Sequence, residues 1–130
     1  MKHLVTIFTF FLCCSFSTTS LQQKTDLTLL CATKWHMSYM EVDGDKRDFA
    51  SVSDEESWMI FHEDGEHEIM SIGVKYSGKW KYEEDTNELH LTDETGLTIQ
   101  KIEKLTVKEL ILSFSFEGKK GKLFLINKEG

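Results

Sequence analysis

The chain has 130 residues, of which 22 are Asp or Glu and 15 are Lys or Arg, so its formal net charge is −7. This length fits a single domain. The acidic balance argues against nucleic acid and against anionic membrane surfaces as partners, because both carry negative charge themselves.

The first twenty residues have the layout of a secretory signal peptide. Lys2 and His3 precede the apolar run LVTIFTFFLCCSF, and small polar residues follow at 17–20. The run is shorter than the roughly 20 apolar residues that a helix needs to span a bilayer. We therefore expect residues 1–20 to be a signal peptide and residues 21–130 to form an exported domain of the periplasm or cell envelope.

The two cysteines in the apolar run, Cys13 and Cys14, raise the alternative of a lipid anchor. A lipoprotein processing site has a small residue before its lipidated cysteine, whereas Leu12 precedes this pair, so unmodified signal-peptide cysteines are favoured. Membrane attachment is expected only if one of the two is lipidated. Beyond residue 20 the single cysteine is Cys31, so no intramolecular disulfide can form and the fold must rest on its core.

The rest of the chain consists of short, alternating apolar segments separated by turn residues, and it contains no proline. Asp26 can cap one helical turn over residues 27–30. The alternation predicts eight strands, at 33–42, 57–62, 66–75, 79–83, 88–93, 97–104, 109–117 and 122–128. Eight consecutive strands in up-and-down order predict an all-β fold, a closed antiparallel barrel.

The turns set the expected strand register. Three connections end in glycine and are interpreted as three-residue hairpin loops, at 63–65, 76–78 and 94–96. Two more are interpreted as four-residue loops, at 84–87 and 118–121. This register places apolar residues opposite one another, for example Trp80 and Leu91. It also turns Lys101 inward, which a β-bulge near Gln100–Lys101 would correct.

The stretch FHEDGEHEI holds two histidines around one glycine. With a three-residue loop, Trp58 faces the interior, His62 lies on the inner face and His67 on the outer face, so the two histidines point apart. A two-residue turn would instead pair the histidines and place Met59 inside. Two histidines are fewer than the three or four ligands of a zinc site, so we predict no metal site.

No catalytic motif stands out. The sequence lacks a Gly-x-Ser-x-Gly, a Gly-rich phosphate loop and a Cys-x-x-Cys. An acid–base pair of His62 with Glu66 or Glu68 is the weak alternative. Cys31 flanks the helical turn and is interpreted as a small buried thiol. We expect no enzyme activity and no cofactor.

The barrel interior beneath the long loop 43–57 is the candidate binding site, because an aromatic, uncharged lining suits a flat or greasy small molecule. The loop acts as a lid or as a polar surface loop, and Ser53 to Glu56 fit a helix capping box. The predicted ligand-binding residues are Tyr39, Trp58, Val74, Trp80, Phe114, Phe116 and Leu123. The alternative is a packed core, since large side chains can fill an eight-stranded barrel, which leaves an interaction domain that uses its acidic surface or outer Phe124 and Ile126.

A helical turn and a strand with an early tryptophan read LLCATKWHMSYMEVDG, and WMIFHEDGEH, GKWKYEEDTNELHLT and IEKLTVKELILSF follow. Together these stretches resemble the lipocalin-like family of small secreted β-barrel domains of the Bacteroidetes type, over residues 26–128. True lipocalins have Gly-x-Trp at the first strand, and here Thr33 replaces the glycine while Trp35 is kept. The resemblance implies a barrel closed at its base by Trp35, with an apolar cavity and no reaction.

Overall fold

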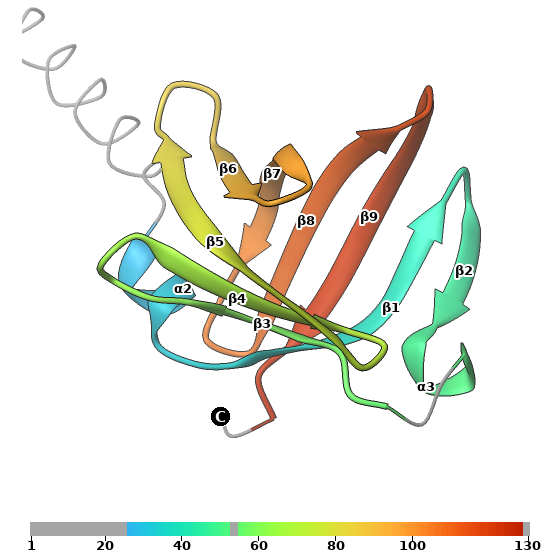
Figure 1. Ribbon diagram of the computed structural model, residues 1–130. Helices are drawn as coiled ribbons and strands as arrows, with labels where there is room; N and C mark the ends of the chain where they lie inside the picture. Colours follow the sequence, from blue (N-terminus) through green and yellow to red (C-terminus); the bar gives the residue numbers. More distant parts are fainter. Residues whose placement is uncertain (1–25, 53–54, 129–130) are drawn as a thin grey trace, which may run out of the picture.

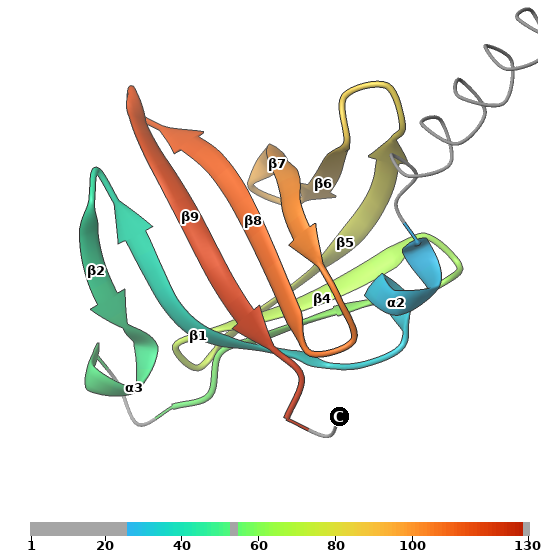
Figure 2. The same cartoon turned by 180° about the vertical axis from the view of Figure 1, so that it is seen from behind.

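The computed structural model describes residues 26–52 and 55–128 (Figures 1 and 2). Its elements are α2 (Leu27–Cys31), β1 (Trp35–Val42), β2 (Asp45–Asp48), α3 (Phe49–Val52), β3 (Trp58–Phe61), β4 (Glu66–Ser71), β5 (Val74–Glu83), β6 (Glu88–Asp93), β7 (Gly96–Leu105), β8 (Glu109–Phe116) and β9 (Lys119–Ile126). The expected signal peptide at 1–20 and the start of the expected capping box at Ser53 lie outside the described residues.

Eight strands form a closed antiparallel barrel, as predicted. Strands β1 and β3 to β9 pair with their neighbours in that order, and β9 pairs back onto β1. A ninth strand, β2, pairs with β1 alone. It arises because Asp43 and Gly44 both have positive φ and form a two-residue hairpin turn within the segment predicted as a loop. The 43–57 loop therefore contains the edge strand β2 and the single turn of α3.

The helical turn α2 closes one end of the barrel, which we call the base. Asp26 caps α2 as expected, since its side chain accepts a hydrogen bond from the Thr28 backbone N–H. The Trp35 indole N–H donates to the Leu30 carbonyl at 3.0 Å, and both residues are fully buried. The chain between α2 and β1 is thereby fixed under the barrel, and Trp35 closes the base as the family resemblance implied.

The packed core fills the base half of the barrel. Its buried members come from α2 and from six of the eight barrel strands: Leu30, Trp35, Met59, Phe61, Leu89, Leu91, Ile102, Leu110, Leu112, Leu123 and Leu125. Burial of this apolar surface is the main stabilising contribution, at about 25 cal/mol per Å² removed from water. Trp80 and Tyr82 pack against this core as partly buried neighbours.

The β4–β5 connection differs from the predicted loop at 76–78. The turn lies at Ile72–Gly73, both with positive φ, and Ser71 pairs with Val74. Strand β5 then continues through Gly78, where an added Cβ would lie 1.9 Å from the Thr92 carbonyl oxygen of β6. Gly78 is therefore required for the close approach of two strands and not for a turn.

The β6–β7 turn has two residues, one fewer than predicted. Asp93 pairs with Gly96, so Gln100 faces inward and Ile99 faces outward. This register brings Ile102 inside without a bulge at Gln100–Lys101. The bulge occurs farther along β7, between Ile102 and Lys104.

At the β8–β9 turn, the predicted four-residue loop 118–121 is wrong. The turn has two residues, and Phe116 pairs with Lys119. The register shift is even, so the predicted inward faces of β8 and β9 are kept: Leu112 pairs with Leu123 inside the barrel.

The predicted pairing of β3 with β4 is correct, but its faces are reversed. Trp58 pairs with Met70 as expected. However, inward Trp35 of β1 pairs with Met59, so Met59 faces the interior and Trp58 lies on the outer face. The Lys34 ammonium group lies over the Trp58 ring, 4.6 Å from the ring centroid.

The two histidines of this hairpin point apart, again with the predicted faces exchanged. His62 lies outside, where its Nε2 is 2.7 Å from the Glu68 carboxylate. His67 is buried inside the barrel. Trp80, predicted to pair with Leu91, does so.

Candidate functional site

The end of the barrel opposite α2 is hollow. A pocket of about 1130 Å³ opens there, and its lining includes residues beside the turns β4–β5, β6–β7 and β8–β9. We call its inner part the cup and define it by the lining residues that face the barrel interior or close over it from α3: Met37, Met40, Phe49, Ser71, Thr98, Gln100, Phe114, Phe116, Gly121 and Leu123. The cup is thus mainly apolar, with three polar side chains.

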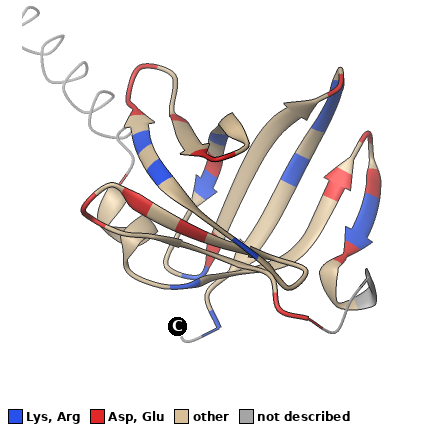
Figure 3. Cartoon of the chain, viewed as in Figure 1, with Lys and Arg blue, Asp and Glu red and all other residues tan. Residues whose placement is uncertain are grey.

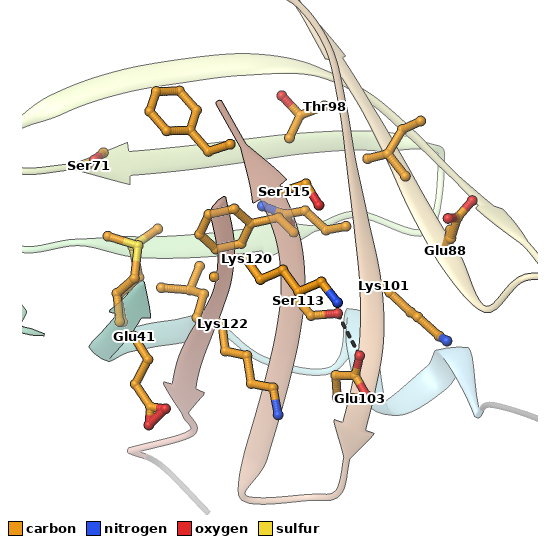
Figure 4. A pocket seen from close by; sticks show the side chains of 18 of the residues that line it. Glu41, Ser71, Glu88, Thr98, Lys101, Glu103, Ser113, Ser115, Lys120 and Lys122 are labelled. Atoms are coloured by element: carbon orange, nitrogen blue, oxygen red, sulfur yellow. Dashed lines mark hydrogen bonds between the residues drawn. The ribbon is translucent and has the colours of Figure 1, made fainter. Parts of the chain in front are cut away.

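A glycine on β9 helps to keep the cup open. Gly121 is the cross-strand partner of Phe114 and is buried. A Cβ built on it would lie 2.6 Å from the Phe114 ring, so that ring lies directly against the Gly121 backbone. The Phe114 side chain therefore rests against the wall. Small side chains at Ser71 and Thr98 leave room on the opposite strands (Figure 4).

The cup also opens sideways, between β7 and β8. The pairing of these strands ends at Lys101 and Ser113. Beyond that point the residues 96–100 pair with β6 and the residues 114–116 pair with β9, and β7 diverges from β8 in Figure 1. Apolar side chains are left exposed along this opening, with Phe116 61% accessible. Contiguous exposed apolar surface of this kind marks binding sites on soluble proteins.

Charged residues border the pocket only from the outer face of the sheet. Lys101, Ser113 and Lys122 form one cross-strand row, and each alternates with an inward-facing neighbour along its strand. Glu103 belongs to the same outer face and accepts a hydrogen bond from the Ser113 hydroxyl at 2.6 Å (Figure 4). Figure 3 shows the positions of lysines along β7 and β9. The inner wall of the cup is therefore uncharged.

Three of the predicted ligand-binding residues line the cup, namely Phe114, Phe116 and Leu123. Their role in binding stays a prediction. Val74 belongs to the inward-facing set of β5 but lies beside the exposed β4–β5 turn, and it does not line the pocket.

The placement of Tyr39 in the interior is wrong. A bulge between Met37 and Tyr39 shifts the register of β1 against β9 and turns Tyr39 outward. Its ring stacks on Phe124 with centroids 4.2 Å apart. Met40 takes the inward position in its place and lines the cup.

The two tryptophans predicted as lining residues also lie elsewhere. Trp58 faces outward for the reason given above. Trp80 does face inward, but in the packed base: its ring contacts Phe61 edge-on at 5.7 Å and its indole N–H donates to the His62 carbonyl at 2.9 Å. Neither ring lines the pocket.

Sequence reasoning missed Phe49, Thr98 and Gln100 as cup residues. Phe49 is the one aromatic residue in the polar segment 43–57, and its isolation there could have marked it as a residue that packs against the barrel. Thr98 and Gln100 were hidden by the one-residue error in the β6–β7 turn.

His67 is a buried titratable group on β4, paired with Phe61 of β3. It is 1% exposed, and neither ring nitrogen has a hydrogen-bond partner among the described residues. Burial lowers the pKa of His67, while the backbone of Lys79 and the carboxylate of Asp93 act in the opposite direction more weakly. The imidazole is therefore held in its neutral form inside the barrel.

We expect the protein to lose stability as the pH falls below the ordinary histidine pKa of about 6.5. The unfolded chain takes up a proton there, whereas folded His67 resists protonation until a lower pH, so acid favours unfolding. The slope from one proton cannot exceed about 1.4 kcal/mol per pH unit. Urea unfolding at pH 7.5 and 5.5 checks this, and His67→Leu should show a smaller loss than the wild type. An equal loss in both proteins would contradict the assignment to His67.

Among the described residues, no cluster of three His, Cys, Asp or Glu side chains is arranged to hold a metal ion. The described part of the chain also has no helix long and apolar enough to cross a bilayer. Cys31 is half-buried, and its pKa is raised by burial and by the charge of Glu63, so its thiol is not activated as a nucleophile.

Among solved structures, the chain is similar to a lipocalin-like protein from Bacteroides uniformis. The two share 16% identity with a TM-score of 0.54, over 73% of this chain and 96% of that one. The chain has a lipocalin-like fold. A DUF4847 family protein from Bacteroides vulgatus is similar at 9% identity and a TM-score of 0.55, over 80% of this chain and 98% of that one. No family model and no curated protein sequence matches the chain. The resemblance predicted from the sequence is thus confirmed at the level of the fold.

Proposed function

We propose that this lipocalin-like barrel binds a small, apolar ligand in the cup. The observation that carries the proposal is the unequal filling of the barrel. The base half is packed around Trp35, whereas a pocket of about 1130 Å³ opens in the opposite half, and the part of its lining that faces the barrel interior is uncharged and mainly apolar. Ligand sites are concave, largely preformed and mostly apolar, with volumes from about 300 to 1,000 Å³.

The signal-peptide layout of residues 1–20 supports export of the domain. An exported binding domain would take up its ligand outside the cytoplasm. The mouth of the cup and the opening between β7 and β8 supply two routes for an apolar molecule to enter without unfolding the packed base.

A second candidate is an interaction domain that uses its outer surface. Tyr39 and Phe124 stack on the outside of β1 and β9, and Ile126 is exposed next to them on β9. The Lys46 ammonium group lies 4.2 Å from the Tyr39 ring centroid and covers part of this surface. Because a charged group already covers part of the stack, we rank this candidate second.

Titration with the neutral dye N-phenyl-1-naphthylamine tests the proposed function, because its fluorescence rises in an apolar site. We expect saturable binding to the wild type. Thr98→Trp places an indole in the cup and should weaken binding at least about tenfold, which equals about 1.4 kcal/mol. The matched control is Thr92→Trp on the outer face of β6, opposite Leu97, and it should bind as the wild type does.

Circular dichroism must first show that both variants keep the barrel. Binding that is weakened equally by both substitutions would place the dye outside the cup. The absence of saturable binding to the wild type would exclude the cup as an apolar site and leave the interaction domain.

A further inference from the structure

A single inward-facing amide on β7 stands out in the cup. Gln100 is the cross-strand partner of buried Leu89 and lines the pocket. Its Oε1 atom is buried and has no hydrogen-bond partner among the described residues. Buried polar atoms in folded proteins are almost always satisfied, so an orphaned atom in a pocket wall needs an explanation.

The residues around Gln100 explain why the barrel itself does not satisfy the amide. Its inward neighbours along β7 are Thr98 and Ile102, and its cross-strand partner on β6 is Leu89. Across the cup lie the apolar side chains of Met37 and Leu123. A polar group fixed in a mostly apolar wall is the usual arrangement by which a pocket orients its ligand.

We infer that Gln100 is the polar anchor of the cup and that the ligand is a neutral apolar molecule with a hydroxyl group at its buried end. The inference rests on the proposed function and specifies its ligand class. A hydroxyl both donates and accepts hydrogen bonds, so it pairs with the Gln100 carbonyl oxygen by donation and with the amide N–H by acceptance.

Charged end groups do not fit this position. A buried carboxylate or ammonium needs a counter-charge, and the inner wall of the cup supplies none. Lys101 and Lys122 border the pocket, but they lie on the outer face of the sheet, away from Gln100. Recognition of a hydroxyl by a buried amide discriminates strongly against the analogue that lacks it, because the amide is then left unpaired.

Competition against N-phenyl-1-naphthylamine with 2-naphthol and naphthalene tests this inference, because the two probes share one ring system and differ in the hydroxyl. We expect the wild type to bind 2-naphthol on the order of tenfold more tightly than naphthalene. Gln100→Leu should abolish this preference and leave naphthalene binding unchanged or tighter. Gln100→Met provides the same test with an unbranched side chain, in case the leucine variant fails to fold.

Thr92→Val is the matched control, because it removes a hydroxyl from the outer face of β6, outside the cup, and should keep the preference for 2-naphthol. Equal binding of both probes by the wild type would overturn the role of Gln100 and leave the apolar cup intact. A preference that survives in both Gln100 variants, or that is lost in Thr92→Val, would also overturn it. Failure of the dye and both probes to bind would instead remove the proposed function itself.

Discussion

Replacing Trp35 with alanine is expected to destabilise the protein by about 3–5 kcal/mol, the usual cost of removing a fully buried tryptophan. The ring is 0% exposed at the base and contacts the core cluster. Its loss also leaves the Leu30 carbonyl without the indole N–H that it accepts at 3.0 Å. Because small domains are stable by only about 5–15 kcal/mol, the variant should unfold at a clearly lower urea concentration.

Urea unfolding, monitored by circular dichroism, measures this loss of stability. Two further variants are needed to interpret it. Trp35→Phe keeps an aromatic ring but removes the indole N–H. Its smaller loss of stability therefore measures the combined cost of the lost hydrogen bond and the reduced side-chain volume. Val107→Ala, in the exposed β7–β8 turn, should stay within about 0.5 kcal/mol of the wild type. A loss below about 1 kcal/mol for Trp35→Ala would show that Trp35 does not close the base.

Gly78→Ala is expected to destabilise the protein by about 3 kcal/mol, because its methyl group would meet backbone. The added Cβ would lie 1.9 Å from the Thr92 carbonyl oxygen and 3.0 Å from the His67 ring. The oxygen belongs to the backbone of β6, so β5 and β6 must separate to relieve the clash. That movement would weaken the pairing that begins at Lys79 and Thr92.

Ser77→Ala, one residue away on the same strand and exposed, is the control and should change the free energy of unfolding by no more than about 0.5 kcal/mol. Thermal unfolding of the two variants side by side makes the comparison. If Gly78→Ala were as stable as Ser77→Ala, the close approach of β5 to β6 at this point would be wrong.

The closed barrel and its base could be predicted because their signals are local and repeated. Alternation at Leu89 and Leu91 indicates inward-facing strand positions, and the four-residue connection at 84–87 fixes their pairing with Tyr82 and Trp80. A predicted register, however, defines pairs and not which face of the sheet is inside. Trp58 was paired correctly and placed on the wrong face, because the deciding contact is the distant pairing of Trp35 with Met59.

The cup could not be predicted because it depends on single-residue irregularities. A bulge turns Tyr39 outward and Met40 inward. Ile72 occupies a left-handed turn conformation with φ of 48°, which β-branched residues rarely adopt, so the sequence favoured Gly78 as the turn glycine. A shift of one residue inverts every side chain of a strand, and the shorter β6–β7 turn therefore placed Gln100 inside.

Methyl NMR of methionine-labelled protein, titrated with N-phenyl-1-naphthylamine, tests the ligand-binding cup most directly. The described methionines sample each environment: Met37 and Met40 line the cup, Met59 is buried in the base and Met70 lies on the outer face. We expect saturable shifts at Met37 and Met40 and little change at Met59 and Met70. Shifts confined to Met70, or no saturable shift at any methionine, would contradict a binding site inside the barrel.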